Sequence, residues 1–132
     1  MNEQERKKLK QHGIGRFFRS FKFSMQGLQY AFKYEQNIVI HLIITVLVIC
    51  LGLYVNLNFN EWIFIILLIG LVVATELINT SIEAVVDLAC TEIHPLAKVA
   101  KDTAAASVLI FALTSVIAGG LIFVPKIIEI LF

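Results

Sequence analysis

Three long stretches without a charged residue constrain this 132-residue chain more than any other feature. They cover residues 36–60, 62–75 and 103–125. As a result, 58% of the residues are hydrophobic, only 16% are charged, and the mean hydropathy is +0.84. Soluble domains contain roughly 45–50% apolar residues, and so few polar side chains cannot cover a globule of this size. The chain therefore belongs in a bilayer.

The sequence predicts an all-α membrane protein with three spanning helices, folded as one domain over 1–132. A helix of about 20 apolar residues crosses the hydrocarbon core. The predicted spans cover about 37–55, 62–88 and 103–124. Turn-forming residues at 56–60 and a polar segment at 91–102 connect them, and Pro125 follows the third span. The second apolar run ends at Thr75, so the lower half of that helix is polar.

The distribution of Lys and Arg predicts how the chain is oriented. Ten of the eleven lie before the first span or in segment 91–102, and only Lys126 lies beyond the third span. Lys and Arg that flank spans stay on the cytoplasmic side. We therefore expect the N-terminus inside and the C-terminus outside the cell.

The sequence of residues 14–34 predicts a further helix, with one apolar face and one basic face. At about 100° per residue, the apolar and the basic side chains separate into opposite arcs. The apolar arc contains Phe17, Phe18, Phe21, Met25, Leu28 and Phe32, and the polar arc contains Arg19, Lys22, Gln26 and Lys33. Such a helix lies on a membrane surface, with its basic arc toward anionic headgroups. Packing on another protein is the alternative. Residues 1–12 are expected to form a flexible basic tail.

A polar stripe follows one face of the second predicted span. It consists of Glu76, Asn79, Glu83 and Asp87, within an arc of about 80°. A charge in the hydrocarbon costs at least about 2.5–3.5 kcal/mol, so the stripe must face protein, water or metal. One interpretation is structural: the acids lie at the interfacial end of the helix and pair with Lys98, Lys101 or the basic surface helix.

The functional interpretation of the polar stripe is a site for Mg²⁺ and a polyphosphate. Mg²⁺ prefers oxygen ligands and is usually shared between one or two carboxylates and substrate phosphates. Lys98 and Lys101 would supply the counter-charge. No Walker loop or protein-kinase Gly-rich loop is present, so side chains on helices would have to form the site. His41 is expected at the membrane interface, and His94 is expected to be a structural or surface group rather than a ligand. The two cysteines are expected to form neither a disulfide nor a metal site.

Three segments of the sequence carry a specific combined pattern. They are SMQGLQYAFKYE at 24–35, ELINTSIEAVVD at 76–87 and HPLAKVAKDTAAA at 94–106. Together they resemble the small bacterial integral-membrane diacylglycerol and undecaprenol kinases, over nearly the whole chain from Arg16 onward. The third segment looks more like the undecaprenol branch. The resemblance implies a homotrimer in the bacterial cytoplasmic membrane, with a surface helix and three spans per chain and active sites shared between neighbouring chains.

The resemblance also implies an activity and a set of site residues. The family transfers the γ-phosphate of MgATP to a lipid hydroxyl at the cytoplasmic interface, here undecaprenol, with diacylglycerol as the alternative. Glu76 would be the general base, with Asn79 orienting the reacting groups. The other implied roles are Mg²⁺ binding by Glu35 and Glu83, support of the nucleotide site by Asp87 and Asp102, and phosphate contacts by Lys101 and Arg16.

Two other classes of function are compatible with parts of the sequence. A small cation transporter would use the polar stripe as its ion path. That class explains Glu76 and Glu83, but not the surface helix or the clustering of acids at one interface. A membrane adaptor without chemistry predicts that the stripe can be neutralised without harm. Nucleic acid is not an expected partner.

Overall fold

The computed structural model describes Glu3 and residues 14–132, which divide into two compact units, one up to Tyr34 and one from Glu35 to the C-terminus. In the first unit, helix α2 covers Ile14–Tyr34, the segment in which the sequence predicts a helix. The expected flexible tail at 1–12 lies, Glu3 apart, outside the described residues.

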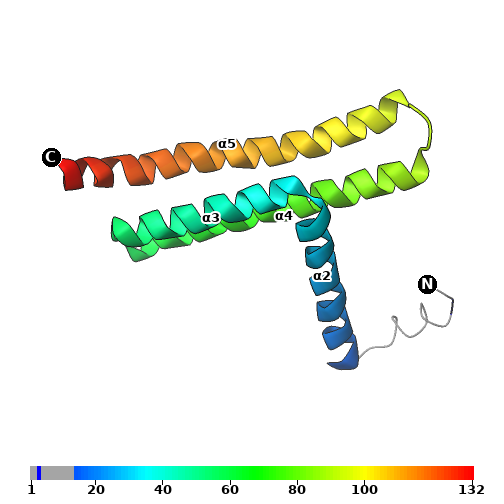
Figure 1. The fold of residues 1–132 in the computed structure, drawn as a ribbon, viewed down its shortest axis with the longest axis horizontal. Coiled ribbons are helices and arrows are strands. Elements are labelled where there is room, and N and C mark those ends of the chain that lie inside the picture. Colours follow the sequence, from blue (N-terminus) through cyan, green and yellow to red (C-terminus); the bar gives the residue numbers. More distant parts are fainter. Residues whose placement is uncertain (1–2, 4–13) are drawn as a thin grey trace. The chain divides into compact units, whose positions relative to one another are not determined.

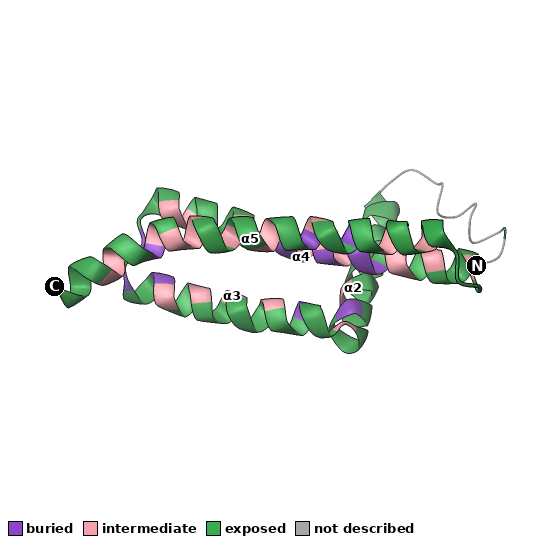
Figure 2. Cartoon of the chain, turned by 90° about the horizontal axis from the view of Figure 1, so that it is seen from above, coloured by how far each residue is buried: buried purple, intermediate pink, exposed green. Residues whose placement is uncertain are grey.

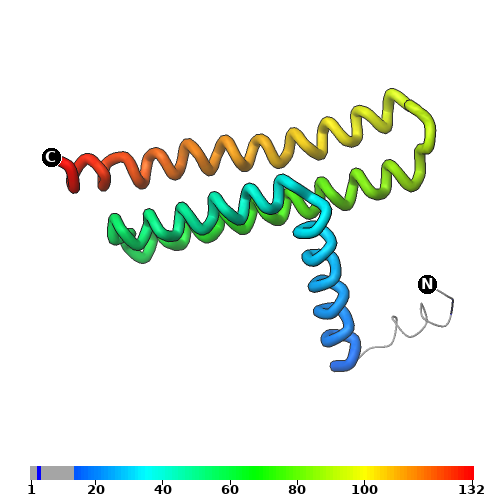
Figure 3. Tube along the Cα trace, in the orientation of Figure 1, coloured from blue at the N-terminus to red at the C-terminus, as the bar shows by residue number. Residues whose placement is uncertain are grey.

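The second unit contains three long helices. They are α3 (Gln36–Tyr54), α4 (Phe59–Ala89) and α5 (Pro95–Leu131). All three are long and apolar enough to cross a bilayer, which confirms the prediction of an all-helical chain with three candidate spans. They run along a common direction, and α4 packs against both α5 and α3 (Figure 1; Figure 3). Most of their outward surface is exposed in the single chain (Figure 2).

Local hydrogen bonds close the turn between α3 and α4. The side chain of Asn58 accepts a hydrogen bond from the Glu61 N–H at 3.0 Å, and the Glu61 carboxylate accepts one from the Asn58 N–H at 2.7 Å. This reciprocal cap satisfies backbone donors that a helix start leaves without partners. Asn56 has a left-handed φ of 52°, which Asn tolerates better than most residues. Because of this cap, α4 begins at Phe59, so the turn is shorter than the predicted 56–60.

A buried apolar cluster lies at this turn. It contains Val55 and Leu57 of the turn, Ile65 of α4 and Phe123 of α5, and Val48 and Leu51 of α3 pack against it. An ion pair lies at the same end of the bundle, with 3.1 Å between Lys126 Nζ of α5 and Glu61 Oε2 of α4. Both side chains are 22% exposed. The cap, the apolar cluster and the ion pair together fix the start of α4 against the end of α5.

Gly52 allows the close approach that this cluster requires. A Cβ at this position would lie 2.9 Å from Leu57 Cδ1 and 2.9 Å from Trp62 Cη2. We expect Gly52→Ala to destabilise the protein by about 1–3 kcal/mol through overpacking, measured as a lower thermal midpoint in detergent. Gly70→Ala is the control, because nothing lies within 4 Å of a Cβ there. Equal midpoints for the two variants would contradict the tight packing at Gly52.

The connection between α4 and α5 is shorter than the predicted polar segment 91–102. That prediction is wrong because α5 already begins at Pro95. Proline is well accommodated at the first position of a helix, and Nδ1 of His94 accepts a hydrogen bond from the Leu96 N–H at 3.2 Å. His94 is thus the N-cap residue of α5 and is exposed, which is compatible with the expected structural or surface group. The Lys and Asp residues at 98, 101 and 102 lie on a helix, with fixed spacing.

Helix α5 also continues beyond the predicted end of the third span. It passes through Pro125 and ends at Leu131. A proline inside a helix removes one backbone hydrogen bond and clashes with the preceding turn. In apolar surroundings the remaining backbone groups still require helical partners, so the helix continues past the proline.

Candidate active site

The polar stripe changes from buried to exposed along α4. Glu76 is only 1% exposed and Asn79 6%, whereas Glu83 is half-buried and Asp87 is exposed. Glu76 is the largest fully buried side chain in the part of the chain that the structure describes. Burying a carboxyl group is costly unless it is hydrogen-bonded or paired. The position of Glu76 therefore requires a specific explanation.

Hydrogen bonds set the orientation of the amide in this stripe. The Asn79 amide nitrogen Nδ2 donates to Glu83 Oε1 at 3.0 Å. Among the described residues, the Asn79 oxygen Oδ1 and the Glu76 oxygen Oε2 are buried without a hydrogen-bond partner. The Thr80 hydroxyl donates its hydrogen bond to the Glu76 backbone carbonyl, at 3.1 Å, and not to the Glu76 carboxylate. Two acceptor oxygens, one turn apart on α4, thus have no hydrogen-bond donor among the residues that the structure describes.

Both acceptor-bearing residues line a cavity of about 310 Å³, called the polar cavity below. Helix α3 contributes Asn37, Ile40 and His41 to its wall. Helix α5 contributes Ala105, Val108, Leu109 and Ala112. The cavity is large enough for water or a small polar group, and Glu76 is the one acidic side chain among its described lining residues.

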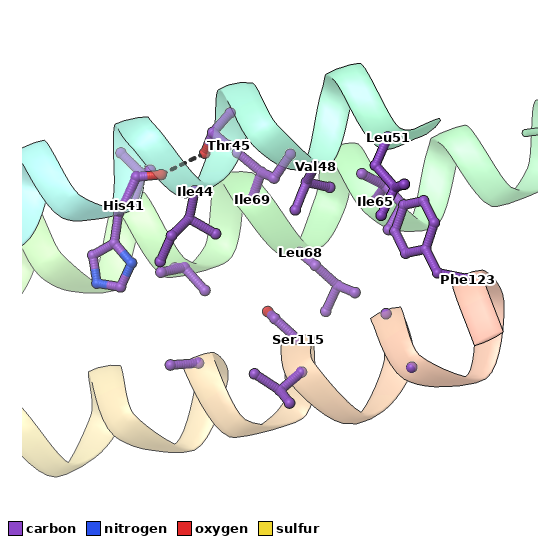
Figure 4. A pocket seen from close by; sticks show the side chains of 16 residues that line it. His41, Ile44, Thr45, Val48, Leu51, Ile65, Leu68, Ile69, Ser115 and Phe123 are labelled. Carbon is purple, nitrogen blue, oxygen red and sulfur yellow. Dashed lines mark hydrogen bonds between the residues drawn. The ribbon is translucent and has the colours of Figure 1, made fainter. Parts of the chain in front are cut away.

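A second cavity, of about 280 Å³, lies between α3, α4 and α5 and is called the apolar cavity (Figure 4). Its polar side chains are His41, Thr45 and Ser115, and the other lining residues are aliphatic, glycine or Phe123. His41 lies at one end of this cavity, and Leu51 and Phe123 lie at the other (Figure 4). His41 and Ala112 line both cavities, so a buried carboxyl group and an apolar compartment adjoin.

Two ion pairs between described residues lie beyond Glu83, and one of them connects α4 with α5. Lys101 Nζ lies 2.5 Å from Asp87 Oδ1, and Lys98 pairs with Asp102 on the same helix. The structural interpretation of the polar stripe therefore holds for Asp87 in the single chain. It does not extend to Glu76 and Glu83, which form no ion pair with a described residue. The exposed pairs contribute little to stability.

The remaining two predicted site residues are Glu35 and Arg16. Glu35 is the N-cap residue of α3, and its side chain makes no capping hydrogen bond. Arg16 lies in α2, in the other compact unit, and is exposed. No group of three or more His, Cys, Asp or Glu side chains that could hold a metal ion forms within the described residues. Here Mg²⁺ would rely on one or two carboxylates and substrate phosphates.

His41 is the residue that sequence reasoning undervalued. Its place near the start of a span suggests an interfacial side chain, yet it lines the same cavity as Glu76. A weak signal was present in the sequence, because a titratable side chain inside a predicted span is by default a candidate for function.

Comparison with known proteins identifies the class to which this chain belongs. The family model "Prokaryotic diacylglycerol kinase" matches residues 22–123. The undecaprenol kinase of Bacillus subtilis is 44% identical over 113 residues, which cover 86% of this chain and 92% of that protein. A diacylglycerol kinase of Helicobacter pylori is 43% identical over 76% of this chain and 79% of its own length. One from Synechocystis is 37% identical over 85% of this chain and 65% of its own length.

A membrane-embedded lipid kinase is the class that these matches and the three candidate spans define. The chain belongs to the prokaryotic diacylglycerol kinase family. It is a membrane enzyme that uses ATP to phosphorylate a lipid. The choice between an enzyme, a cation transporter and an adaptor is thereby made in favour of the enzyme.

Proposed function

We propose that the protein transfers the γ-phosphate of MgATP to the hydroxyl of undecaprenol, giving undecaprenyl phosphate at the cytoplasmic interface. The observation that carries this proposal is the buried carboxyl group of Glu76, which lies beside an apolar cavity and has an oxygen without a described partner. The 44% identity to a protein named undecaprenol kinase favours this lipid over diacylglycerol, the name carried by the other relatives cited above.

Glu76 acts as the general base in this proposal. A base must lie within hydrogen-bond reach of the proton that it removes, and Oε2 of Glu76 is available for the lipid hydroxyl. Asn79 orients the reacting groups: its nitrogen is held by Glu83, so its oxygen is left to accept from the substrate. The polar cavity would hold the hydroxyl end of the lipid, and the adjoining apolar cavity part of its chain.

The residues at the polar end of the stripe fit a divalent cation. Only one oxygen of Glu83 accepts the Asn79 hydrogen bond, and the half-buried side chain is still partly accessible to a metal ion. Glu83 and Glu35 would hold Mg²⁺, whose oxygen preference matches this donor set. When bound, Mg²⁺ neutralises charge on the phosphates during transfer. Asp87, Asp102 and Lys101 would support the nucleotide, and Arg16 would contact its phosphates.

Lys101 tests the nucleotide half of this site. In the single chain it pairs with Asp87, and we propose that phosphate competes for the same ammonium group. Lys101→Met should raise the KM for MgATP at least about tenfold, since a charge-assisted hydrogen bond contributes about 1.5–3 kcal/mol. The KM for lipid should stay unchanged in steady-state assays. Lys126→Met, at the far end of α5, is the control for loss of a lysine. A change confined to the lipid KM would place Lys101 at the headgroup instead.

We further propose that three chains assemble and share their sites, with α2 lying on the cytoplasmic membrane surface. Support comes from the small residues Ala104, Ala105 and Ala106 early in α5, which permit close helix approach. The absence of a three-ligand metal group within the described part of one chain is consistent with a site completed by nucleotide phosphates and a neighbouring chain. Cross-linking of purified protein to a trimer would support this assembly.

The proposed topology places the N-terminus inside the cell and the C-terminus outside. It rests on the excess of Lys and Arg before α3 and near the start of α5. Cysteine introduced at Asn58 should react with an impermeant reagent added outside intact cells, and cysteine at Gln4 or Thr91 should not, in a background without Cys50 and Cys90. Labelling of Gln4 and Asn58 from the same side would overturn the model.

A direct competition between lipids tests the proposed substrate. Purified protein with MgATP should phosphorylate undecaprenol with a higher kcat/KM than diacylglycerol when both are present in the same vesicles. A higher kcat/KM for diacylglycerol would overturn the choice of lipid while leaving the lipid kinase class intact.

A further inference from the structure

The proton released by the proposed reaction must leave a buried group. Phosphorylation of an alcohol frees the hydroxyl proton, and the base that accepts it must lose it before the next turnover. Glu76 is 1% exposed, so bulk water has little direct access to its carboxyl group. A second group that exchanges protons with Glu76 would regenerate the base.

His41 has the position and the chemistry for this exchange. It projects from α3 and lines the polar cavity together with Glu76. The residue is half-buried, so part of its side chain is open to the surroundings, in contrast to Glu76. Thr45 bonds to the His41 backbone carbonyl at 2.8 Å and not to the ring (Figure 4). An imidazole ring can both take up and release a proton under physiological conditions, which is the chemistry that the exchange requires.

We propose that His41 accepts the proton from Glu76 after each phosphoryl transfer and releases it to water. This inference rests on the proposed function of Glu76. In the first step, the lipid oxygen bonds to the γ-phosphorus of ATP while the bond from that phosphorus to the bridging oxygen breaks and ADP leaves, and the hydroxyl proton moves to the Glu76 carboxylate. In the second step, the proton moves from Glu76 to a ring nitrogen of neutral His41, directly or through water in the polar cavity. Deprotonation of His41 by water then restores both groups.

Few titratable side chains other than His41 line the two cavities and could exchange a proton with Glu76. Among the described lining residues, α4 contributes one titratable side chain, Glu76, and α5 contributes none. Helix α3 contributes His41 alone. Glu35 and Glu83, the proposed metal ligands, line neither cavity. Proton exchange inside the cavities is therefore assigned to the pair His41 and Glu76.

The test is chemical rescue of the full-length enzyme in vesicles. His41→Ala should lower kcat about tenfold or more, less than the 10²–10⁴-fold expected for loss of the base itself. Imidazole in the buffer should restore much of the lost kcat. The rescue should grow as pH rises and more of the added imidazole is in its neutral, proton-accepting form. His94→Ala, which removes a histidine from the N-cap of α5, should not respond to imidazole.

A second variant separates proton exchange from packing. His41→Asn keeps a hydrogen-bonding side chain that cannot take up a proton, so it should be as slow as His41→Ala and should keep the wild-type thermal midpoint. Wild-type kcat in His41→Asn, or no response of His41→Ala to imidazole, would overturn the role of His41. An inactive wild-type enzyme would instead overturn the proposed function itself.

Discussion

Glu76→Gln should lower kcat by about 10²–10⁴-fold, the usual contribution of a general base. The substitution keeps the size of the side chain and removes its basicity. The KM for MgATP should change little, because Glu76 is proposed to contact the lipid hydroxyl and not the nucleotide. Steady-state kinetics and the thermal midpoint of the same purified protein provide the measurement.

Glu61→Gln is the matched control for this variant. Glu61 lies on the same helix and supports both the cap at Asn58 and the ion pair with Lys126. Its substitution should therefore lower the thermal midpoint while leaving kcat unchanged below the transition. Near-normal turnover in Glu76→Gln would remove Glu76 as the base and leave it a structural carboxyl group.

Glu83→Gln should raise the concentration of Mg²⁺ required for half-maximal activity at least about tenfold, in line with the effect of disturbing a metal site. Glutamine still offers an oxygen to the Asn79 amide, so the hydrogen bond that orients Asn79 is kept. The change therefore removes the charge of a proposed metal ligand with little effect on its neighbour. Activity measured against Mg²⁺ concentration at fixed ATP gives the result.

Glu92→Gln controls for the loss of one negative charge. Glu92 is exposed and lies in the short connection between α4 and α5. Its substitution should leave the Mg²⁺ dependence unchanged. If Glu83→Gln also kept the wild-type dependence, the assignment of Glu83 as a metal ligand would be wrong.

The arrangement of the helices could be predicted from the sequence because the bilayer imposes a simple rule on length and polarity. Uncharged stretches gave three candidate spans, and all three are present as helices. The helix ends were less predictable. Polarity suggested a connection up to Asp102, but a histidine cap and a proline at the first position start α5 at Pro95. Local capping chemistry, not hydropathy, fixes such ends.

The candidate site could be proposed from the sequence where a periodic pattern places side chains on one helix face. Glu76, Asn79 and Glu83 could be grouped in this way, and the structure shows the Asn79–Glu83 hydrogen bond. The approach of His41 to the same cavity depends on how α3 packs against α4, which no spacing within one helix encodes. The pairing of Lys101 with Asp87 likewise depends on where α5 begins.

The proposed reaction moves phosphate from ATP to a lipid hydroxyl at a carboxylate and metal site of this chain. Its most direct test is the fate of the labelled γ-phosphate of ATP, incubated with purified protein and undecaprenol in vesicles. We expect labelled undecaprenyl phosphate with Mg²⁺ present and none after chelation. In Glu76→Gln, the rate of lipid labelling should fall by at least about 10²-fold. Label that appears only as inorganic phosphate, or lipid labelling that persists in Glu76→Gln, would contradict it.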